Sequence, residues 1–233
     1  MQAVAETVFD TAYLTSVVSI GAVMIAKSMS SKRKKQYLLF GIMAVTLGCG
    51  DSFHLIPRMI SQCAPGLGSL TAALGFGKLV TSITMTAFYV LLYYVWRQRY
   101  HIEGKKELTT AVWMLSIARV VLCLMPQNRW TSAVPSYSWG IYRNIPFAIL
   151  GAILVVLYHN SAKEHHDHDF RYMWLAITIS FACYIPVVLG ADKIPALGAL
   201  MIPKTCAYLW AVIMGFKAMK KSDDQPQEVL AAV

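Results

Sequence analysis

Residues Ser69 to Trp96 read SLTAALGFGKLVTSITMTAFYVLLYYVW, and Lys78 is the single charged residue among them. A helix needs roughly 20 mostly apolar residues to cross a bilayer, and this stretch is longer than that. Six further apolar runs of sufficient length lie along the chain, at about 10–30, 36–61, 107–127, 139–159, 170–191 and 195–217. The sequence therefore predicts an all-α integral membrane protein with seven transmembrane helices.

The composition of the whole chain supports this class. Of its 233 residues, 57% are hydrophobic and 14% are charged, whereas an average soluble domain has about 25% charged residues. This excludes a water-soluble enzyme, and the five cysteines, which form no CxxC pair, do not indicate a disulfide-rich domain. Because the connections between the apolar runs are short, we expect one seven-helix membrane domain over residues 1–219 and a polar cytoplasmic tail over 220–233.

Lys and Arg residues are distributed unequally between the two sets of connections. On one side lie Lys27, Lys32, Arg33, Lys34, Lys35, Arg97, Arg99, Lys105, Lys106, Lys163, Arg171, Lys217, Lys220 and Lys221. The opposite connections hold only Arg129 and Lys193. Because short cytoplasmic loops collect Lys and Arg, the N-terminus is expected outside and the C-terminus inside. The net charge of +9 largely reflects this anchoring, so we expect no nucleic-acid partner.

A weak internal similarity indicates a possible 3+1+3 parallel repeat. The segment SLTAALGFGK, which ends at Lys78, aligns with PALGALMIPK, which ends at Lys204, and Gly21-Ala22 aligns with Gly151-Ala152. Two units of three helices would then be joined by the fourth helix. This layout resembles that of sugar-transporting and PQ-loop proteins in architecture only, because their motif is missing. Chance matching among apolar residues is the alternative explanation.

Five cations fall inside the predicted spans rather than in the connections: Arg58, Lys78, Arg119, Arg143 and Lys204. A charge within a spanning helix costs about 2.5–3.5 kcal/mol on insertion scales and usually faces the bundle interior or a wet cavity. Asp51 is the one clearly embedded acid. Because buried cations repel one another unless an anion lies among them, we expect a polar cavity, open to the exterior, in which a ligand supplies the missing negative charge.

The densest polar motif is GDSFHLIPR at residues 50–58. Asp51, His54 and Arg58 are spaced i, i+3 and i+7, which predicts that they share one helix face. A carboxylate one turn from an imidazole can orient it as a general base or proton relay, so Asp51 and His54 are the candidate catalytic or proton-coupling pair. In the structural alternative, Asp51 neutralises a neighbouring cation and His54 bonds a carbonyl freed by Pro57.

Polar residues beside the embedded cations complete the predicted site. The candidate substrate-binding residues are Arg58, Lys78, Ser82, Arg119, Arg143, Asn144, Lys204 and Tyr208. Two of them have structural alternatives, because Ser82 can bond its own i−4 carbonyl and Arg143 can extend to the membrane surface. Trp130, in the connection before Arg143, is typical of an aromatic belt and could also form a lid.

No metal or other cofactor is expected. The ligand-rich stretch at 165–169, HHDHD, lies in a cytoplasmic turn far from the embedded charges. The embedded His54 has no second histidine at zinc-ligand spacing, which argues against a hydrolase of the ceramidase and adiponectin-receptor type. Lys204, with Asp51 as counter-ion, could form a Schiff base, but Leu200 occupies the position where microbial rhodopsins carry an aspartate.

The leading functional hypothesis is a membrane transporter or binding protein for a small anionic or zwitterionic solute, with Asp51 and His54 coupling a proton. The alternative is an intramembrane enzyme that acts on a phospholipid or lipid-linked phosphate in the outer leaflet, so whether the chain is an enzyme stays open. The expected partners are a small anionic solute or lipid headgroup and membrane lipid. We expect a multi-pass protein of a cell membrane, and the short loops favour a bacterial cytoplasmic membrane.

Overall fold

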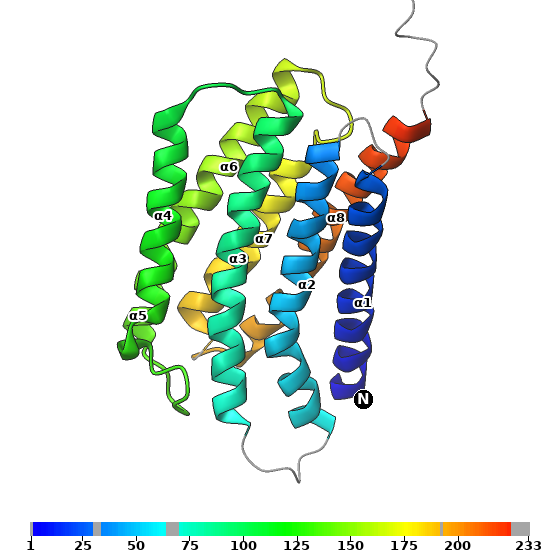
Figure 1. Ribbon diagram of the computed structural model, residues 1–233. Coiled ribbons are helices and arrows are strands. Elements are labelled where there is room, and N and C mark those ends of the chain that lie inside the picture. Colours follow the sequence, from blue (N-terminus) through cyan, green and yellow to red (C-terminus); the bar gives the residue numbers. More distant parts are fainter. Residues whose placement is uncertain (1, 30–33, 64–69, 192, 225–233) are drawn as a thin grey trace, which may run out of the picture.

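The computed structural model describes residues 2–29, 34–63, 70–191 and 193–224, and every regular element in these ranges is helical (Figure 1). The helices are α1 (Gln2–Ser28), α2 (Lys34–Cys63), α3 (Thr71–Arg99), α4 (Lys106–Leu124), α5 (Tyr137–Tyr142), α6 (Ile145–Glu164), α7 (Met173–Gly190) and α8 (Met201–Asp224). Two short 3₁₀ turns, Pro126–Asn128 and Pro195–Leu200, precede α5 and α8.

Within the described residues, seven helical segments are long and apolar enough to cross a membrane, which confirms the predicted number. They are Val4–Ser28, Lys35–Cys63, Thr71–Arg99, Lys106–Leu124, Tyr137–Glu164, Met173–Gly190 and Ala196–Ser222. The first span begins at Val4, before the predicted residue 10, because α1 already includes Glu6. The orientation in the membrane and the 3+1+3 repeat stay predictions.

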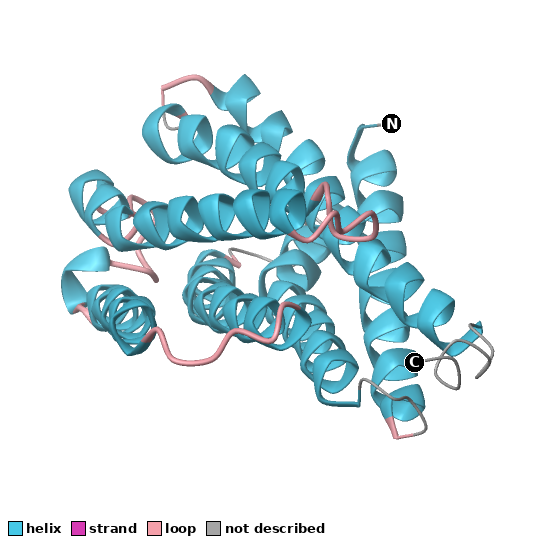
Figure 2. Ribbon diagram, turned by 90° about the horizontal axis from the view of Figure 1, so that it is seen from above, coloured by secondary structure: helices cyan, strands magenta, loops and turns pink. Residues whose placement is uncertain are grey.

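Each span packs against the next one along the chain, from α1 to α8, and α8 also contacts α1. Figure 2 shows the helices of this bundle from above. Small residues permit a close approach between α1 and α2. A Cβ atom at Gly21 would lie 3.0 Å from the Gly41 carbonyl oxygen, and one at Gly41 would lie 2.9 Å from the Gly21 carbonyl oxygen. Glycines at such a crossing let two helix backbones pack tightly without lipid between them.

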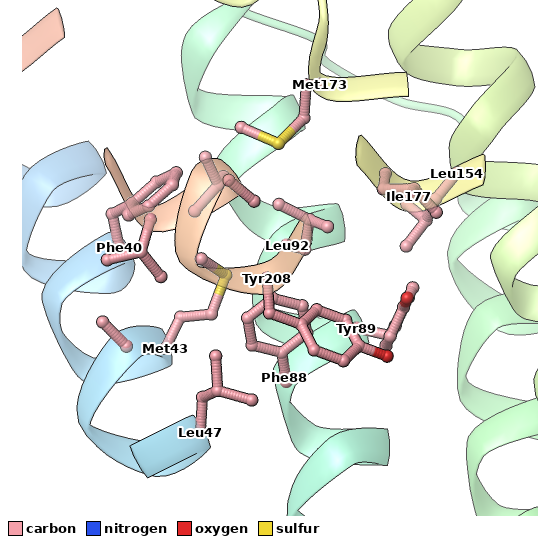
Figure 3. Close-up of a cluster of buried hydrophobic side chains, with 14 of the residues drawn as sticks. Phe40, Met43, Leu47, Phe88, Tyr89, Leu92, Leu154, Met173, Ile177 and Tyr208 are labelled. Atoms are coloured by element: carbon pink, nitrogen blue, oxygen red, sulfur yellow. The ribbon is translucent and has the colours of Figure 1, made fainter. Parts of the chain in front are cut away.

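An aromatic core fills the middle of the bundle. Figure 3 shows Phe88 and Tyr89 of α3 beside Tyr208 of α8, with Phe40 of α2 nearby. The Phe88 and Tyr208 ring centroids are 5.6 Å apart in an edge-to-face arrangement, which is the geometry that aromatic pairs prefer. This layer separates two polar regions, one at each end of the bundle.

The end at which α8 finishes holds a closed ion-pair network. Arg99 donates two hydrogen bonds of 2.8 Å to the Asp167 carboxylate and a third of 3.3 Å to Asp169. Lys221 also bonds Asp169 at 3.1 Å. These contacts tie α3 and α8 to the connection that holds the HHDHD stretch, so part of that stretch has a structural role. α8 continues to Asp224, and residues 225–233 of the predicted tail lie outside the described residues, so the division of the chain at residue 219 stays a prediction.

Candidate functional site

A cavity of about 470 Å³ lies at the other end of the bundle, where α1 begins. Side chains from every long helix except α1 contribute to its described lining, and the connection between α4 and α5 closes one side. Trp130 of that connection packs so close to α3 that a Cβ atom on Gly75 would lie 1.6 Å from the Trp130 carbonyl oxygen. Only glycine at this position lets the connection sit over the cavity.

Arg119 of α4 is the most buried charge of the cavity, with 2% of its surface exposed. Its guanidinium carbon lies 3.2 Å from the centroid of the Phe147 ring, a stacked cation–π contact. The Nε and Nη1 atoms are buried and have no hydrogen-bond partner of good geometry among the described residues. The aromatic ring therefore stabilises the charge, while two donors lack a well-aligned acceptor in the part of the chain that the structure describes.

Lys204 of α8 is the second buried cation, with 9% of its surface exposed. Its Nζ atom lies 4.9 Å from the Tyr184 ring centroid and 5.3 Å from that of Tyr208. Asp51 is close enough to interact with Lys204 electrostatically, although no ion pair within 4.0 Å joins them among the described contacts. The lysine is thus held between two rings with a carboxylate at longer range.

Arg143, directly after α5, is held by the connection over the cavity. Its Nη1 atom donates to the Asn128 side-chain oxygen at 2.7 Å, and its guanidinium carbon lies 4.2 Å from the Trp130 ring centroid. Asn144 follows it and accepts a 3.0 Å hydrogen bond from the Tyr184 hydroxyl. Arg143 therefore points into the cavity lining, where fixed neighbours orient it.

Lys78, Ser82 and His54 also line the cavity, and their surroundings differ. Lys78 of α3 is exposed, so it stands at the cavity mouth. The Ser82 hydroxyl donates to the Lys78 carbonyl at 2.7 Å, which is the i−4 bond expected in the structural alternative. His54 of α2 lines the cavity, and its Nδ1 atom is buried without a hydrogen-bond partner of good geometry among the described residues.

Asp51, His54 and Arg58 of α2 do not all face the cavity. The Tyr13 hydroxyl of α1 donates to Asp51 at 2.8 Å, and Arg58 forms a 2.8 Å ion pair with Glu6, also of α1. Neither Asp51 nor Arg58 is among the lining residues of the cavity. At about 100° per residue, position i+7 is offset from position i by about 20° and position i+3 by about 60°. Asp51 and Arg58 therefore both face α1, whereas His54 turns toward α3.

The cavity as a whole carries an excess of positive charge. Four of the five embedded cations line it: Lys78, Arg119, Arg143 and Lys204. No Asp or Glu belongs to the lining within the described part of the chain. Because attraction between opposite charges is strong where water is partly excluded, this arrangement favours an anion.

Sequence reasoning overlooked several side chains that shape this environment. Phe147 and Tyr184 supply the rings on which the cations lie, Asn128 fixes Arg143, and Tyr13 and Glu6 engage the α2 motif from α1. Aromatic residues are abundant in any membrane span, so their presence alone carried no signal. A rule that each embedded cation requires a carboxylate or a ring would have directed attention to them.

No group of three or more His, Cys, Asp or Glu residues that could hold a metal ion occurs in residues 2–29, 34–63, 70–191 and 193–224. The described cysteines are not joined by disulfide bonds. Neither a protein-family model nor a curated protein matches this chain. Any functional conclusion therefore depends on the chemistry of the cavity.

Proposed function

We propose that this membrane protein binds a small anionic or zwitterionic solute in the cavity and carries it across the bilayer. The observation that supports this proposal is the charge of the lining, with four cations and no carboxylate among the described lining residues. Arg119 supports it most strongly, because it is almost completely buried and two of its donors have no well-aligned partner among the described residues.

Burying unpaired charge is costly, and the cost is offset only when charge and hydrogen bonds are both satisfied. The Arg119 ring contact with Phe147 supplies electrostatic attraction but leaves Nε and Nη1 without a well-aligned oxygen or nitrogen acceptor among the described residues, and the neighbouring Cys123 sulfur is only a weak acceptor. A carboxylate or phosphate would accept from both the guanidinium fork and a nearby ammonium. Arg119 lies close enough to Lys204 for the two charges to interact, so an anion between them would satisfy donors that the described residues leave without a well-aligned partner.

Proton coupling through Asp51 and His54 is the second part of the proposal. The two residues act from different positions, because Asp51 lies toward α1 and Lys204 while His54 lines the cavity. A proton taken up by either one reduces the imbalance of charge that a transported anion creates. Solute uptake into proteoliposomes is accordingly expected to depend on the pH outside, and a flat pH profile would contradict the coupling role.

The second candidate function is an intramembrane enzyme that acts on a phospholipid or lipid-linked phosphate. His54 favours it, since an imidazole beside several cations can act as a base while the cations stabilise developing phosphoryl charge. Product analysis of vesicles that contain the protein distinguishes the two functions, because a carrier returns its ligand chemically unchanged.

Anion-dependent stabilisation of the full chain in phosphatidylcholine nanodiscs tests the binding step. A ligand that binds only the folded state at about 100 times its Kd adds about 2.7 kcal/mol to the free energy of unfolding. We expect methyl phosphate or acetate to raise the Tm relative to an equal ionic strength of chloride. Arg119→Gln and Lys204→Met should abolish that increase.

Arg171→Gln is the matched control, because Arg171 is exposed at the opposite end of the bundle. This variant should respond to the anions as the parent chain does. A parent Tm that none of the anions changes, or an increase that survives both cavity substitutions, would overturn the proposed anion site.

A further inference from the structure

An apolar groove of about 160 Å³ lies between α6 and α7 on the outside of the bundle. Its lining is almost wholly hydrocarbon and includes side chains that are about half exposed in the isolated chain, with Ile145 at 50%, Ile185 at 42% and Leu189 at 47%. Because both helices span the membrane, these side chains face the lipid chains of the bilayer.

The groove and the cationic cavity share a wall. Asn144, Phe147, Tyr184 and Val188 line both spaces, so they are separated by a single layer of side chains. Within this layer the Tyr184 hydroxyl donates a 3.0 Å hydrogen bond to the Asn144 side-chain oxygen, which joins α7 to the start of α6. Tyr184 and Phe147 are therefore among the side chains that have to move for the two spaces to join.

The wall is also where the buried cations lie. Arg119 stacks on the Phe147 ring from the cavity side, and Lys204 lies against the Tyr184 ring. An anionic group that reaches these two cations therefore sits directly behind the two rings that border the groove. An anionic headgroup at these cations could therefore have its hydrocarbon chain in the adjoining groove.

The lining of the cavity has the same mixed character. Besides its cations it presents Leu74, Met85, Val187 and Met201, so apolar side chains make up a large part of its surface. A fully hydrated inorganic anion gains nothing from such surfaces, whereas an apolar chain is stabilised by every methylene that leaves water. The combination favours a ligand with one charged end and one apolar end.

Building on the proposed anion site, we propose that the physiological ligand is a single-chain amphiphilic anion that enters sideways from the membrane. Its carboxylate or phosphate is held by Arg119 and Lys204, and its hydrocarbon chain lies in the groove between α6 and α7. The groove thus serves as the entry route from the bilayer. It is also the part of the site that determines how affinity depends on the length of the hydrocarbon chain.

Chain-length dependence of binding to the full chain in phosphatidylcholine nanodiscs tests this assignment. The probes are methyl phosphate and octyl phosphate, which share a headgroup, and the readout is the ratio of their Kd values by calorimetry. A methylene that moves from water to apolar surroundings tightens binding about fourfold. With only part of the chain in the groove, we expect octyl phosphate to bind at least about tenfold more tightly than methyl phosphate.

Ala148→Phe fills the groove from α6, and the gain from the longer chain should then fall to about that of simple partition into the lipid. Ala152→Phe is the matched control, because Ala152 is an exposed residue one turn farther along α6 and is not among the groove residues. It should retain the full gain. Ile185→Trp fills the same groove from α7 and serves if Ala148→Phe does not fold.

The outcomes separate the two proposals. If both probes bind through Arg119 and Lys204 but the gain is small, or is the same in Ala148→Phe and Ala152→Phe, the amphiphile assignment is overturned and the anion site stands. If neither probe binds, or if Arg119→Gln leaves both affinities unchanged, the anion site itself fails and the amphiphile assignment fails with it. A gain that Ala148→Phe removes and Ala152→Phe keeps supports both.

Discussion

Two arginines of this protein lie over phenylalanine rings at opposite ends of the bundle. The Arg99 guanidinium carbon is 4.7 Å from the Phe170 ring centroid, and that of Arg119 is 3.2 Å from the Phe147 ring centroid. Arg99 also forms a bidentate pair with Asp167 and reaches Asp169. Arg119 has no carboxylate partner among the described residues, and two of its nitrogens are unpartnered.

The difference separates a cation that holds the fold together from one that is available to a ligand. A bidentate pair satisfies both the charge and the donor geometry of a guanidinium, so Arg99 has little left to offer a solute. A ring contact satisfies charge only in part and accepts no conventional hydrogen bond. An anion bound at Arg119 is therefore expected to stabilise the folded protein more than one bound at Arg99.

The largest expected effect is the difference in Tm between two variants in which Arg99 or Arg119 is replaced by methionine. Arg99→Met leaves the Asp167 carboxylate, whose side chain is 7% exposed, without its partner. Removing one member of a buried pair costs about 3–5 kcal/mol, so this variant should unfold at a clearly lower Tm in detergent or nanodiscs. Arg119→Met removes an unpaired charge and should leave the Tm of the anion-free protein equal or higher.

Differential scanning fluorimetry of both variants, with and without methyl phosphate, measures the contrast. Arg99→Met should keep the increase in Tm on adding anion, and Arg119→Met should lose it. Equal destabilisation by the two substitutions would show that Arg119 has a structural partner and would remove the distinction between the two ends.

The Asp167 pair also makes the stability of its end depend on pH. Burial alone would raise the pKa of the Asp167 carboxyl, but the hydrogen bonds and the charge of Arg99 outweigh burial and hold that pKa below its usual value. A depressed folded-state pKa gives stability that is fully present above the unfolded pKa, about 3.9 for Asp, and is lost as the pH falls toward and through the folded pKa.

The Tm of the parent chain should therefore fall as the pH drops below about 4. Asp167→Asn should start from a lower Tm at neutral pH and lose less on acidification. Glu103→Gln, at an exposed position beyond α3, is the control and should follow the parent profile. Parallel profiles for the parent chain and Asp167→Asn would show that another carboxyl governs the acid transition.

The cavity end should respond to a change in the packing of its cover. Gly75→Ala would bring a Cβ atom against the Trp130 carbonyl, so the connection over the cavity must shift. Overpacking of this kind costs about 1–3 kcal/mol, and the shift would also move the Trp130 ring away from Arg143. We expect a lower Tm together with weaker methyl phosphate binding.

Ala73→Val is the matched control, since Ala73 lies on the same helix at an exposed position. It should change neither the Tm nor the affinity for methyl phosphate appreciably. If Gly75→Ala lowers the Tm but the affinity is unaltered, the connection stabilises the bundle without shaping the cavity.

The seven spans and the presence of cations inside them were predictable from the sequence, because both depend on free-energy costs that each segment carries by itself. A long apolar run is long enough to cross a bilayer whatever it packs against, and a charge such as Arg119 is expensive at any position inside it. The sequence therefore indicates that Arg119 and Lys204 need an interior environment. It does not indicate what surrounds them, since the rings of Phe147 and Tyr184 come from other helices.

The α2 motif shows where such reasoning stops. Asp51, His54 and Arg58 share a broad helix face, but an offset of about 60° is enough to turn His54 toward α3 and the cavity while Asp51 faces Tyr13 of α1. Which neighbour occupies each side of a helix is a property of the whole bundle. Spacing within one segment could not show that Glu6 would reach Arg58.

The smallest expected effect tests this last assignment. The Arg58 side chain is 34% exposed and that of Glu6 is 19% exposed, so water weakens their pair. Partly exposed ion pairs contribute about 0–1 kcal/mol, and Arg58→Gln should lower the Tm slightly at most. Because Arg58 does not line the cavity, methyl phosphate should bind Arg58→Gln as tightly as the parent chain, whereas Arg119→Gln loses that binding. A large loss of affinity in Arg58→Gln would instead place Arg58 in the anion site, and the ion pair with Glu6 would then have to open when the ligand enters.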